Sequence, residues 1–235
     1  MRRLPLLALL VAASLLAGCE RRTPAAPPPA EQRPKLLLLT SLPIVFGETF
    51  GLSGNGSAVL TKLETRYRVQ PISLADAASL RGSRLLLAAH PNAQPAETLV
   101  ELDKWVRGGG RLLLLADPML EWHSERPLGD TLRPSPAFAD TGLLTHWGLR
   151  LDAPDQRGPV ERSLAGRRVL VASPGRLVGR CPTEADGLVA RCTIGKGRAT
   201  IIADADFLDD RGVEGASSAG NLDWLAAELT SLETR

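Results

Sequence analysis

Three short apolar runs constrain the fold of this chain more than any other feature of its sequence. They are Lys35–Thr40 (KLLLLT), Arg84–Ala89 (RLLLAA) and Arg111–Ala116 (RLLLLA). None of them alternates polar and apolar residues as a strand with one exposed face does, so each is typical of a strand buried on both faces. Such strands belong to parallel sheets that helices cover on both sides. The runs therefore predict the core of a parallel sheet.

A helix is predicted between the second and third runs. Apolar residues recur at helical spacing in Ala96–Arg107, Pro95 suits the helix start, and Gly108–Gly110 suits its end. A strand, a helix and a strand joined by short connections form a right-handed parallel crossover. Residues 58–67 and 68–72 predict an earlier helix and strand. The first half of the chain therefore predicts an α/β layered arrangement.

The second half is richer in short β-like runs, which Gly and Pro separate. These runs are Arg167–Ala172, Arg176–Val178, Leu188–Ile194 and Ala199–Ala203. Gly195–Gly197 is a hairpin-turn signal, and Asn221–Leu232 predicts an amphipathic helix that covers the sheet. We expect one α/β domain over residues 35–235, with a parallel core, flanking helices and a β-hairpin-rich portion at about 160–203.

The first 19 residues resemble the signal sequence of a bacterial lipoprotein. Two arginines precede Leu4–Leu16, an apolar stretch shorter than the roughly 20 residues of a membrane-spanning helix. Leu16–Cys19 (LAGC) resembles the lipobox, which implies removal of residues 1–18 and a diacylglycerol on the Cys19 thiol. We therefore predict a chain held outside the cytoplasm by a lipid anchor. The alternative is an ordinary secretory signal in which Cys19 lies near the cleavage site by chance.

Residues 19–34 follow as a proline-rich linker. Its five prolines lie among alanines and charged residues, and it has almost no apolar mass to bury, so it should not fold. Proline favours the extended polyproline II conformation, in which this length reaches on the order of 45 Å. The linker suits a folded domain tethered to a membrane. By the lipoprotein resemblance, Glu20 after Cys19, rather than Asp, indicates the outer membrane, with the domain facing the periplasm.

Charge and cysteine content indicate what this chain binds and how its cysteines are paired. The chain has 28 Lys and Arg residues against 26 Asp and Glu, and loss of two arginines with the signal peptide brings its net charge near zero. Without a basic run, the sequence gives no sign of nucleic-acid binding. Cys181 and Cys192 remain once Cys19 carries a lipid, and an even pair in an oxidising compartment predicts a disulfide. The alternative is two free thiols.

Three segments together resemble a known family. They are Lys35–Leu42 (KLLLLTSL), Trp105–Pro118 (WVRGGGRLLLLADP) and Gly195–Leu208 (GKGRATIIADADFL). They are similar to the extracytoplasmic domain of the GldG-like auxiliary subunits of ABC transporters, which is related to the intraflagellar-transport type domain and to the class I glutamine-amidotransferase-like fold. The resemblance implies a flavodoxin-like or amidotransferase-like sheet used for binding or assembly, with an ABC transporter or another envelope protein as partner. Those subunits usually have transmembrane anchors, whereas this chain shows a lipoprotein signal.

The sequence lacks the residues that several kinds of catalytic or binding site require. An amidotransferase needs a cysteine nucleophile at a strand-to-helix turn, and no cysteine lies between Cys19 and Cys181. Gly51–Gly56 is glycine-rich without the Lys-Ser or Lys-Thr pair of a P-loop, and predicts a plain loop. The histidines do not have zinc-site spacing, and His146 is expected to be packed or half-buried among apolar neighbours. The sequence predicts no metal and no cofactor.

A group of polar residues follows the predicted strands. In open α/β sheets, ligands bind beyond the carboxyl ends of the strands. The candidate ligand-binding residues there are Ser41, Glu48, Asn92, Asp117, Glu121, Asp204 and Asp206. Clustered carboxylates bind cations or act as acid and base, but Asp residues also cap turns after strands. We favour capping, and hence a non-catalytic binding or assembly domain. The alternative is a periplasmic hydrolase that uses these carboxylates.

Overall fold

The chain forms a central sheet of seven strands in the computed structural model, which describes residues 29–47, 57–209 and 219–234. In spatial order the strands are β2 (Arg68–Ile72), β1 (Lys35–Thr40), β3 (Leu85–Ala89), β4 (Arg111–Leu115), β11 (Gly197–Ile202), β10 (Val189–Ile194) and β9 (Thr183–Glu184). Neighbours from β2 to β11 are parallel, whereas β10 and β9 are antiparallel additions. With β11 as its fifth strand, the parallel part has the flavodoxin-like order 2-1-3-4-5.

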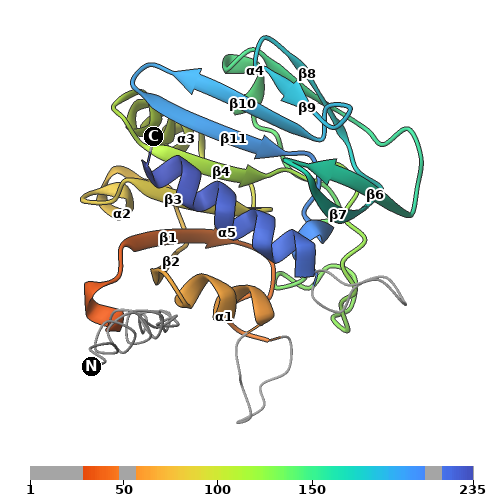
Figure 1. Ribbon diagram of the computed structural model, residues 1–235, viewed down its shortest axis with the longest axis horizontal. Helices are drawn as coiled ribbons and strands as arrows, with labels where there is room; N and C mark the ends of the chain where they lie inside the picture. The colour runs from red at the N-terminus through yellow and green to blue at the C-terminus, as the bar shows by residue number, and fades with distance from the viewer. Residues whose placement is uncertain (1–28, 48–56, 210–218, 235) are drawn as a thin grey trace, which may run out of the picture.

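Helices cover both faces of this sheet and give a molecule of three layers (Figure 1). One face carries α1 (Ala58–Glu64) and α5 (Ala219–Thr234), and the other carries α2 (Ala77–Leu80), α3 (Ala96–Arg107) and α4 (Leu143–His146). Successive side chains of a strand point to opposite faces. In β1, Leu38 therefore packs in the core on the α5 side, and Leu37 packs in the core on the α3 side. Both are fully buried, as the continuous apolar run predicts.

Two further antiparallel pairs come from the second half of the chain. They are the hairpin of β6 (Pro159–Leu164) and β7 (Arg167–Ala172) on the α5 side, and the pair of β5 (Leu149–Asp152) with β8 (Arg176–Gly179) on the α4 side. The 3₁₀ helices η2 (Ala30–Gln32) and η3 (Asp206–Leu208) precede β1 and follow β11. A disulfide joins Cys181 to Cys192 of β10, with Cα atoms 5.0 Å apart, so this predicted pairing is confirmed.

The glycine run after α3 ends the helix through its backbone geometry. Gly109 has a φ of 117° and donates its N–H to the carbonyl of Val106, while Gly110 donates to that of Trp105. These two bonds form a Schellman motif, which satisfies carbonyls that the end of a helix leaves free. A Cβ on Gly110 would also lie 2.4 Å from the Trp105 ring. The compact stop lets β4 begin at Arg111, next to the end of α3.

A proline protects the outer edge of the sheet at β2. Arg68 donates its N–H to the carbonyl of Pro34, so the backbone of Arg68 faces β1 and that of the next residue faces outward. The alternation along the strand places Pro71 among the outward-facing residues, where its missing N–H removes a donor for another strand. This edge of the sheet is therefore a poor template for association with a second chain.

The predicted α/β class, with a parallel core, flanking helices and a β-rich C-terminal portion, is confirmed. The helix predicted over Ala96–Arg107 is observed as α3, with the same first and last residues. The main addition is that β11, the second strand of the predicted hairpin, joins the parallel core beside β4. Residues 1–28, with Cys19, lie outside the described residues, and η2 lies in the last part of the predicted linker. No helix among the described residues is long and apolar enough to cross a membrane.

A partly buried ion-pair network joins α5 to the β10–β11 hairpin. Arg191 donates two hydrogen bonds to the Glu228 carboxylate, at 3.1 and 2.9 Å, and the Thr200 hydroxyl donates a third at 2.7 Å. Only 9% of Glu228 is exposed. Arg191 also donates to Glu184 of β9 at 2.7 Å, so the network links the helix to the three strands β9, β10 and β11.

We expect Glu228→Ala to lower the free energy of unfolding by about 2–3 kcal/mol, because removal of one partner leaves a half-buried charge with less compensation. Urea unfolding followed by circular dichroism measures the change. The matched control is Glu161→Ala on β6, whose carboxylate lies 3.7 Å from exposed Arg168. This exposed pair should contribute less than about 1 kcal/mol. Equal losses in the two variants would contradict a special role for the network.

Candidate functional site

Three aspartates converge at the carboxyl ends of β4 and β11. Asp117 follows β4, and Asp204 and Asp206 follow β11. The two strands are parallel neighbours, with Leu115 in register with Ile202, so their carboxyl ends lie at one edge of the sheet. Asp117 and Asp204 are fully buried, whereas Asp206 is half-buried. The structure thus brings three of the predicted site residues together.

The Asp117 carboxylate holds the ends of the two strands together. One oxygen accepts a hydrogen bond from the N–H of Met119 at 2.8 Å, which closes the turn after β4. The other accepts from the N–H of Ala205 at 2.7 Å and more weakly from that of Asp206 at 3.4 Å. Buried backbone N–H groups need such acceptors. Asp117 therefore caps its own turn and ties it to the segment after β11.

Asp204 and Asp206 bind neighbouring segments in the same way. Asp204 accepts from the N–H of Phe207 at 2.5 Å, which starts η3, and from the N–H of Ala172 at 2.9 Å, which fixes the end of β7. Asp206 accepts from the N–H of Glu121 at 2.7 Å. The three aspartates together attach the loop after β4 and the β6–β7 hairpin to the carboxyl edge of the sheet.

Ser173 completes this cluster, although the sequence analysis did not single it out. It is fully buried with a φ of 46°, which is uncommon for a residue other than glycine and often marks a constrained place. Its hydroxyl donates to the exposed Glu121 carboxylate and accepts from the N–H of Gly158 at 2.8 Å. The available signal was a Ser-Pro-Gly turn after a predicted strand. That pattern does not show that the turn meets the end of β4.

Burial and mutual repulsion favour the protonated carboxyl groups in this cluster. Burial raises the pKa of Asp117 to about 6. Burial, with the Asp117 charge as a further cause, raises the pKa of Asp206 to about 8. The pKa of Asp204 is raised well above its usual range by burial and then by the other two aspartates. In the described part of the chain no cation forms an ion pair with these groups, so like charges dominate the local field.

The other predicted site residues do not form bonds with the cluster. The Ser41 hydroxyl donates to the carbonyl of His90, which is buried with a φ of 45°. His90 Nε2 lies 2.9 Å from the carbonyl of Ser135, and its Nδ1 has no partner among the described residues. Asn92 is exposed at the same edge. Glu48 lies outside the described residues, so its predicted place in the site stays a prediction.

The expectation of a packed or half-buried His146 is wrong. Its side chain is 57% exposed and lies 3.5 Å from the carboxylate of Asp103. The short helix α4 turns Leu143, Leu144 and Trp147 into the core, which leaves His146 on the outer side. Helical spacing, rather than apolar neighbours in the sequence, decides its exposure.

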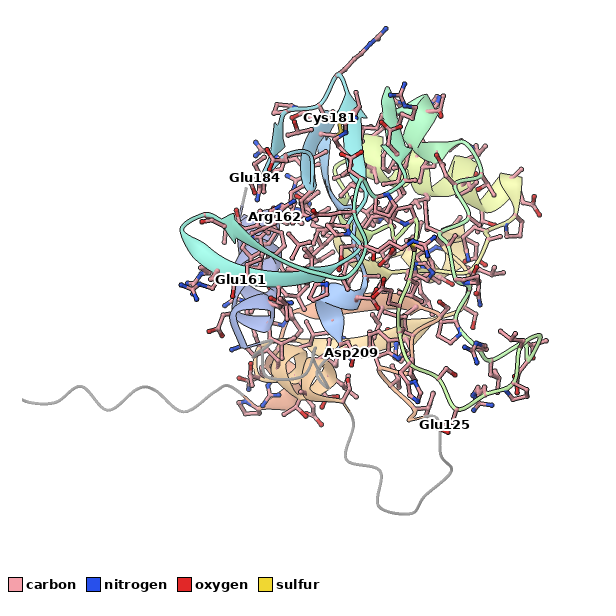
Figure 2. All side chains as sticks on the ribbon, turned by 90° about the vertical axis from the view of Figure 1, so that its right-hand side faces the viewer. Glu125, Glu161, Arg162, Cys181, Glu184 and Asp209 are labelled. Atoms are coloured by element: carbon pink, nitrogen blue, oxygen red, sulfur yellow. A yellow bond between two sulfur atoms is a disulfide. The ribbon has the colours of Figure 1, made fainter. Side chains whose placement is uncertain are left out.

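A polar groove of about 830 Å³ lies beside β8 and β9. Its lining includes Arg162 of β6, Arg176 of β8 and Glu184 of β9, and Figure 2 labels Arg162 near Glu184. The Ala185-Asp186 turn at its rim has φ values of 51° and 58°. Within the described ranges, no group of three His, Cys, Asp or Glu side chains is arranged to hold a metal ion. The groove mixes both charges and presents no recognisable catalytic set.

The geometry of the aspartate cluster suits turn capping better than catalysis. A general acid or base must come within hydrogen-bonding reach of the proton that it transfers. Asp117 and Asp204 are fully buried, and both oxygens of each accept backbone bonds. Half-buried Asp206 and exposed Glu121 are the members that an external molecule can reach.

A family model described as an ABC-type uncharacterized transport system matches residues 33–154, slightly more than half of the chain. The chain belongs to this family. The matched stretch covers β1 to β4 and the loop that carries Asp117 and Glu121. Membership associates the chain with ABC-type transport, in agreement with the resemblance to ABC-transporter auxiliary subunits.

Solved structures share the fold at low sequence identity. The mmIFT52 N-terminal domain has a TM-score of 0.55 at 12% identity, over 83% of this chain and 97% of that one. The cytoplasmic protein STM3548 from Salmonella typhimurium has a TM-score of 0.50 at 12% identity, over 84% of this chain and 98% of that one. Both comparisons support the α/β fold and show nothing beyond it.

Part of a glycosidase has the same fold. Gan42B, a GH42 β-galactosidase from G. stearothermophilus, has a TM-score of 0.51 at 15% identity, over 86% of this chain and 30% of that one. The chain spans about a third of the length of the glycosidases that it matches. Among curated proteins no relative matches the chain.

We expect Asp206→Asn to stabilise the protein as the pH rises. A raised pKa means that the folded state binds more protons than the unfolded state. The free energy of unfolding therefore falls as the pH rises from about 4 to the folded pKa of Asp206, about 8. Asn keeps an oxygen for the Glu121 N–H and has no charge to bury. Urea unfolding should show a variant that is more stable than the parent by roughly 1–3 kcal/mol at pH 8, with the difference vanishing towards pH 4.

The control for this prediction is Asp152→Asn on β5. Its hydrogen bond from Arg150 lowers the pKa of Asp152, so the effect of that substitution should not change between pH 5 and pH 8. Comparison with the parent at each pH also cancels the opposite contribution of His90, whose pKa burial lowers. A variant and a parent with parallel pH profiles would refute the raised pKa of Asp206.

Proposed function

We propose that the chain is a non-catalytic accessory component of an ABC-type transport system, tethered to a membrane and working outside the cytoplasm. The observation that carries this proposal is the family match over residues 33–154. The site supports it, because fully buried Asp117 and Asp204 bind backbone N–H groups and so stabilise turns. The domain then acts through its surface, by binding a partner.

The start of the sequence supports a lipid tether. Leu16–Cys19 resembles a lipobox, and the prolines between Cys19 and Pro34 suit a semi-rigid spacer. The disulfide between Cys181 and Cys192 fits an oxidising compartment, such as the periplasm. Glu20 favours the outer membrane by the same resemblance. The anchor replaces the transmembrane helices that are usual in the resembling subunits.

A periplasmic hydrolase is the second candidate, and one observation favours it. Carboxyl groups with strongly raised pKa values at the carboxyl edge of a sheet are typical of acid–base sites. Asp206, with a pKa of about 8, is held next to exposed Glu121 by a 2.7 Å hydrogen bond. This candidate requires Asp206 or Glu121 to contact a substrate.

We expect the mature protein to begin at Cys19 and to carry a diacylglycerol on that thiol. Mass spectrometry of the N-terminal peptide from purified membranes measures both features. In Cys19→Ser the thiol that accepts the lipid is missing, so the unprocessed chain should accumulate without the lipid mass. A parent protein with an unmodified Cys19, or with its first residue elsewhere, would favour the ordinary secretory signal.

We expect the chain to co-purify with the ATPase and permease of an ABC transporter after solubilisation in mild detergent. Asp206→Asn and Glu121→Gln preserve shape, so they should leave this association and the transport that depends on it within about twofold of the parent. The hydrolase candidate predicts a hydrolytic activity that both substitutions abolish while the folded state persists. Such an activity, in a chain purified without transporter subunits, would overturn the accessory role.

A further inference from the structure

Every strand of the parallel core has a basic residue at its first position or next to it. Lys35, Arg68 and Arg111 open β1, β2 and β4, Arg84 precedes β3, and Arg198 is the second residue of β11. Parallel strands begin at the same edge of a sheet, which is the left-hand side of Figure 1. We call these five residues the amino edge. They form a row of positive charge across the whole parallel core.

Turns and helix ends beside the amino edge add further positive charge. Arg81 follows α2, Arg107 ends α3, and Lys196 lies in the turn between β10 and β11. Among the described residues, the acidic side chains of η2 and of the last five residues of the helices that end at this edge are Glu31, Glu64, Asp103 and Glu233, of which the last two form ion pairs with Arg107 and Arg66. Basic residues therefore outnumber acidic ones on this side of the molecule.

The amino edge contains arginines without acidic partners. In the part of the chain that the structure describes, Arg84 and Arg198 form no ion pair. Arg111 lies in register with Arg198 and donates to the carbonyls of Gly109 and Lys196. Burial lowers the pKa of Arg111, and its two arginine neighbours lower it further. The cations repel one another, so nearby anions relieve an unfavourable interaction.

The opposite edge of the sheet carries carboxyl groups in place of basic ones. The carboxyl ends of β4 and β11 carry Asp117, Asp204, Asp206 and Glu121. Burial raises the pKa of Asp117, Asp204 and Asp206 and so favours their uncharged form, so the positive charge of the amino edge is not matched by these three aspartates. The basic edge is also where the chain enters the fold, because η2 and Pro34 lead directly into β1. Any tether at Cys19 reaches the domain from the basic side.

We propose that the amino edge docks on the anionic phospholipid headgroups of the membrane that holds the lipid anchor. This inference rests on the proposed lipid tether. A basic side chain near an anionic bilayer strengthens binding by roughly fivefold, and the attraction falls off within about 10 Å at 0.1 M salt. The linker keeps the domain close to the membrane, and the basic row sets which side faces it. Charge complementarity and the entry point of the chain both select the same face.

Hydrogen exchange on the lipid-anchored protein in vesicles tests this orientation. We compare vesicles of phosphatidylcholine with vesicles that also contain phosphatidylglycerol. The amides of the turns Gly82–Ser83, Gly108–Gly110 and Gly195–Gly197 should exchange several-fold more slowly on the anionic vesicles, and 0.5 M NaCl should remove the difference. Exchange around Glu125 and Asp130, in the loop after β4, should not change. Equal exchange on both vesicles, or protection of that loop, would overturn the proposal.

Charge-matched variants separate the amino edge from net charge. Arg68, Arg81 and Arg84 are exposed, and within the described ranges their side chains form no hydrogen bond that holds the fold. Their joint replacement by Gln should abolish the protection, because three such residues contribute on the order of 100-fold to binding. The control replaces Arg157, Arg162 and Arg176 by Gln. These lie on or beside the β6–β7 hairpin and β8, and Figure 2 labels Arg162 on that hairpin. Equal effects of the two triples would refute a specific edge.

Two further arms keep the outcome decisive. If the triple variant fails to melt cooperatively, the single change Arg84→Gln, with an expected loss of roughly fivefold, takes its place. Protection of the same turns by inorganic phosphate without vesicles would indicate a discrete anion site and overturn docking on lipid. If Cys19 carries no lipid, the tether fails. Co-sedimentation of the chain with anionic but not neutral vesicles would then still support the amino edge, and its absence would refute it.

Discussion

The parallel pairing of β4 with β11 is the contact on which both ends of this molecule depend. It joins two strands from distant parts of the chain, with Arg111 in register with Arg198 at one end and Leu115 with Ile202 at the other. At the carboxyl end it brings Asp117 within bonding reach of the segment that follows β11. At the amino end it places two arginines side by side. The acidic cluster and the Arg111–Arg198 pair of the basic row are therefore two consequences of one strand pairing.

The acidic cluster shows how a fold accommodates carboxyl groups away from water. Burial of an ionised carboxylate is costly unless hydrogen bonds or a proton compensate it. Asp117 and Asp204 use both, since backbone N–H groups approach their oxygens and burial raises the pKa of each. These hydrogen bonds stabilise the fold, because they attach two loops and a hairpin to the sheet. Groups engaged in this way have little capacity left for a substrate, which favours the accessory role.

The sequence predicts what depends on local pattern and misses what depends on distant contacts. Continuous apolar runs predict β1, β3 and β4, and helical spacing with a glycine stop predicts α3. The rule that ligands bind beyond the carboxyl ends of parallel strands selects Asp117, Asp204 and Asp206, but it does not show that β11 lies beside β4. The sequence analysis misses Ser173, because the role of this residue requires the β6–β7 hairpin to fold back on that edge. The basic residues that precede each run are visible in the sequence, yet they become a row only when the strands are known to be parallel.

The distribution of charge matters more than net charge for the lipid-tethered domain that we propose. A chain with little net charge gains little attraction to a membrane from a distance, and a tether of the proposed kind would leave many orientations open. Within about a Debye length of an anionic surface, however, the basic edge would be attracted, whereas the carboxyl edge, where burial favours uncharged aspartates, would not, so the proposed docking would turn the domain. The loop after β4 and the reachable carboxyl groups of Asp206 and Glu121 would then face away from the bilayer. A partner that binds there meets the domain in one orientation, which lowers the orientational cost of association.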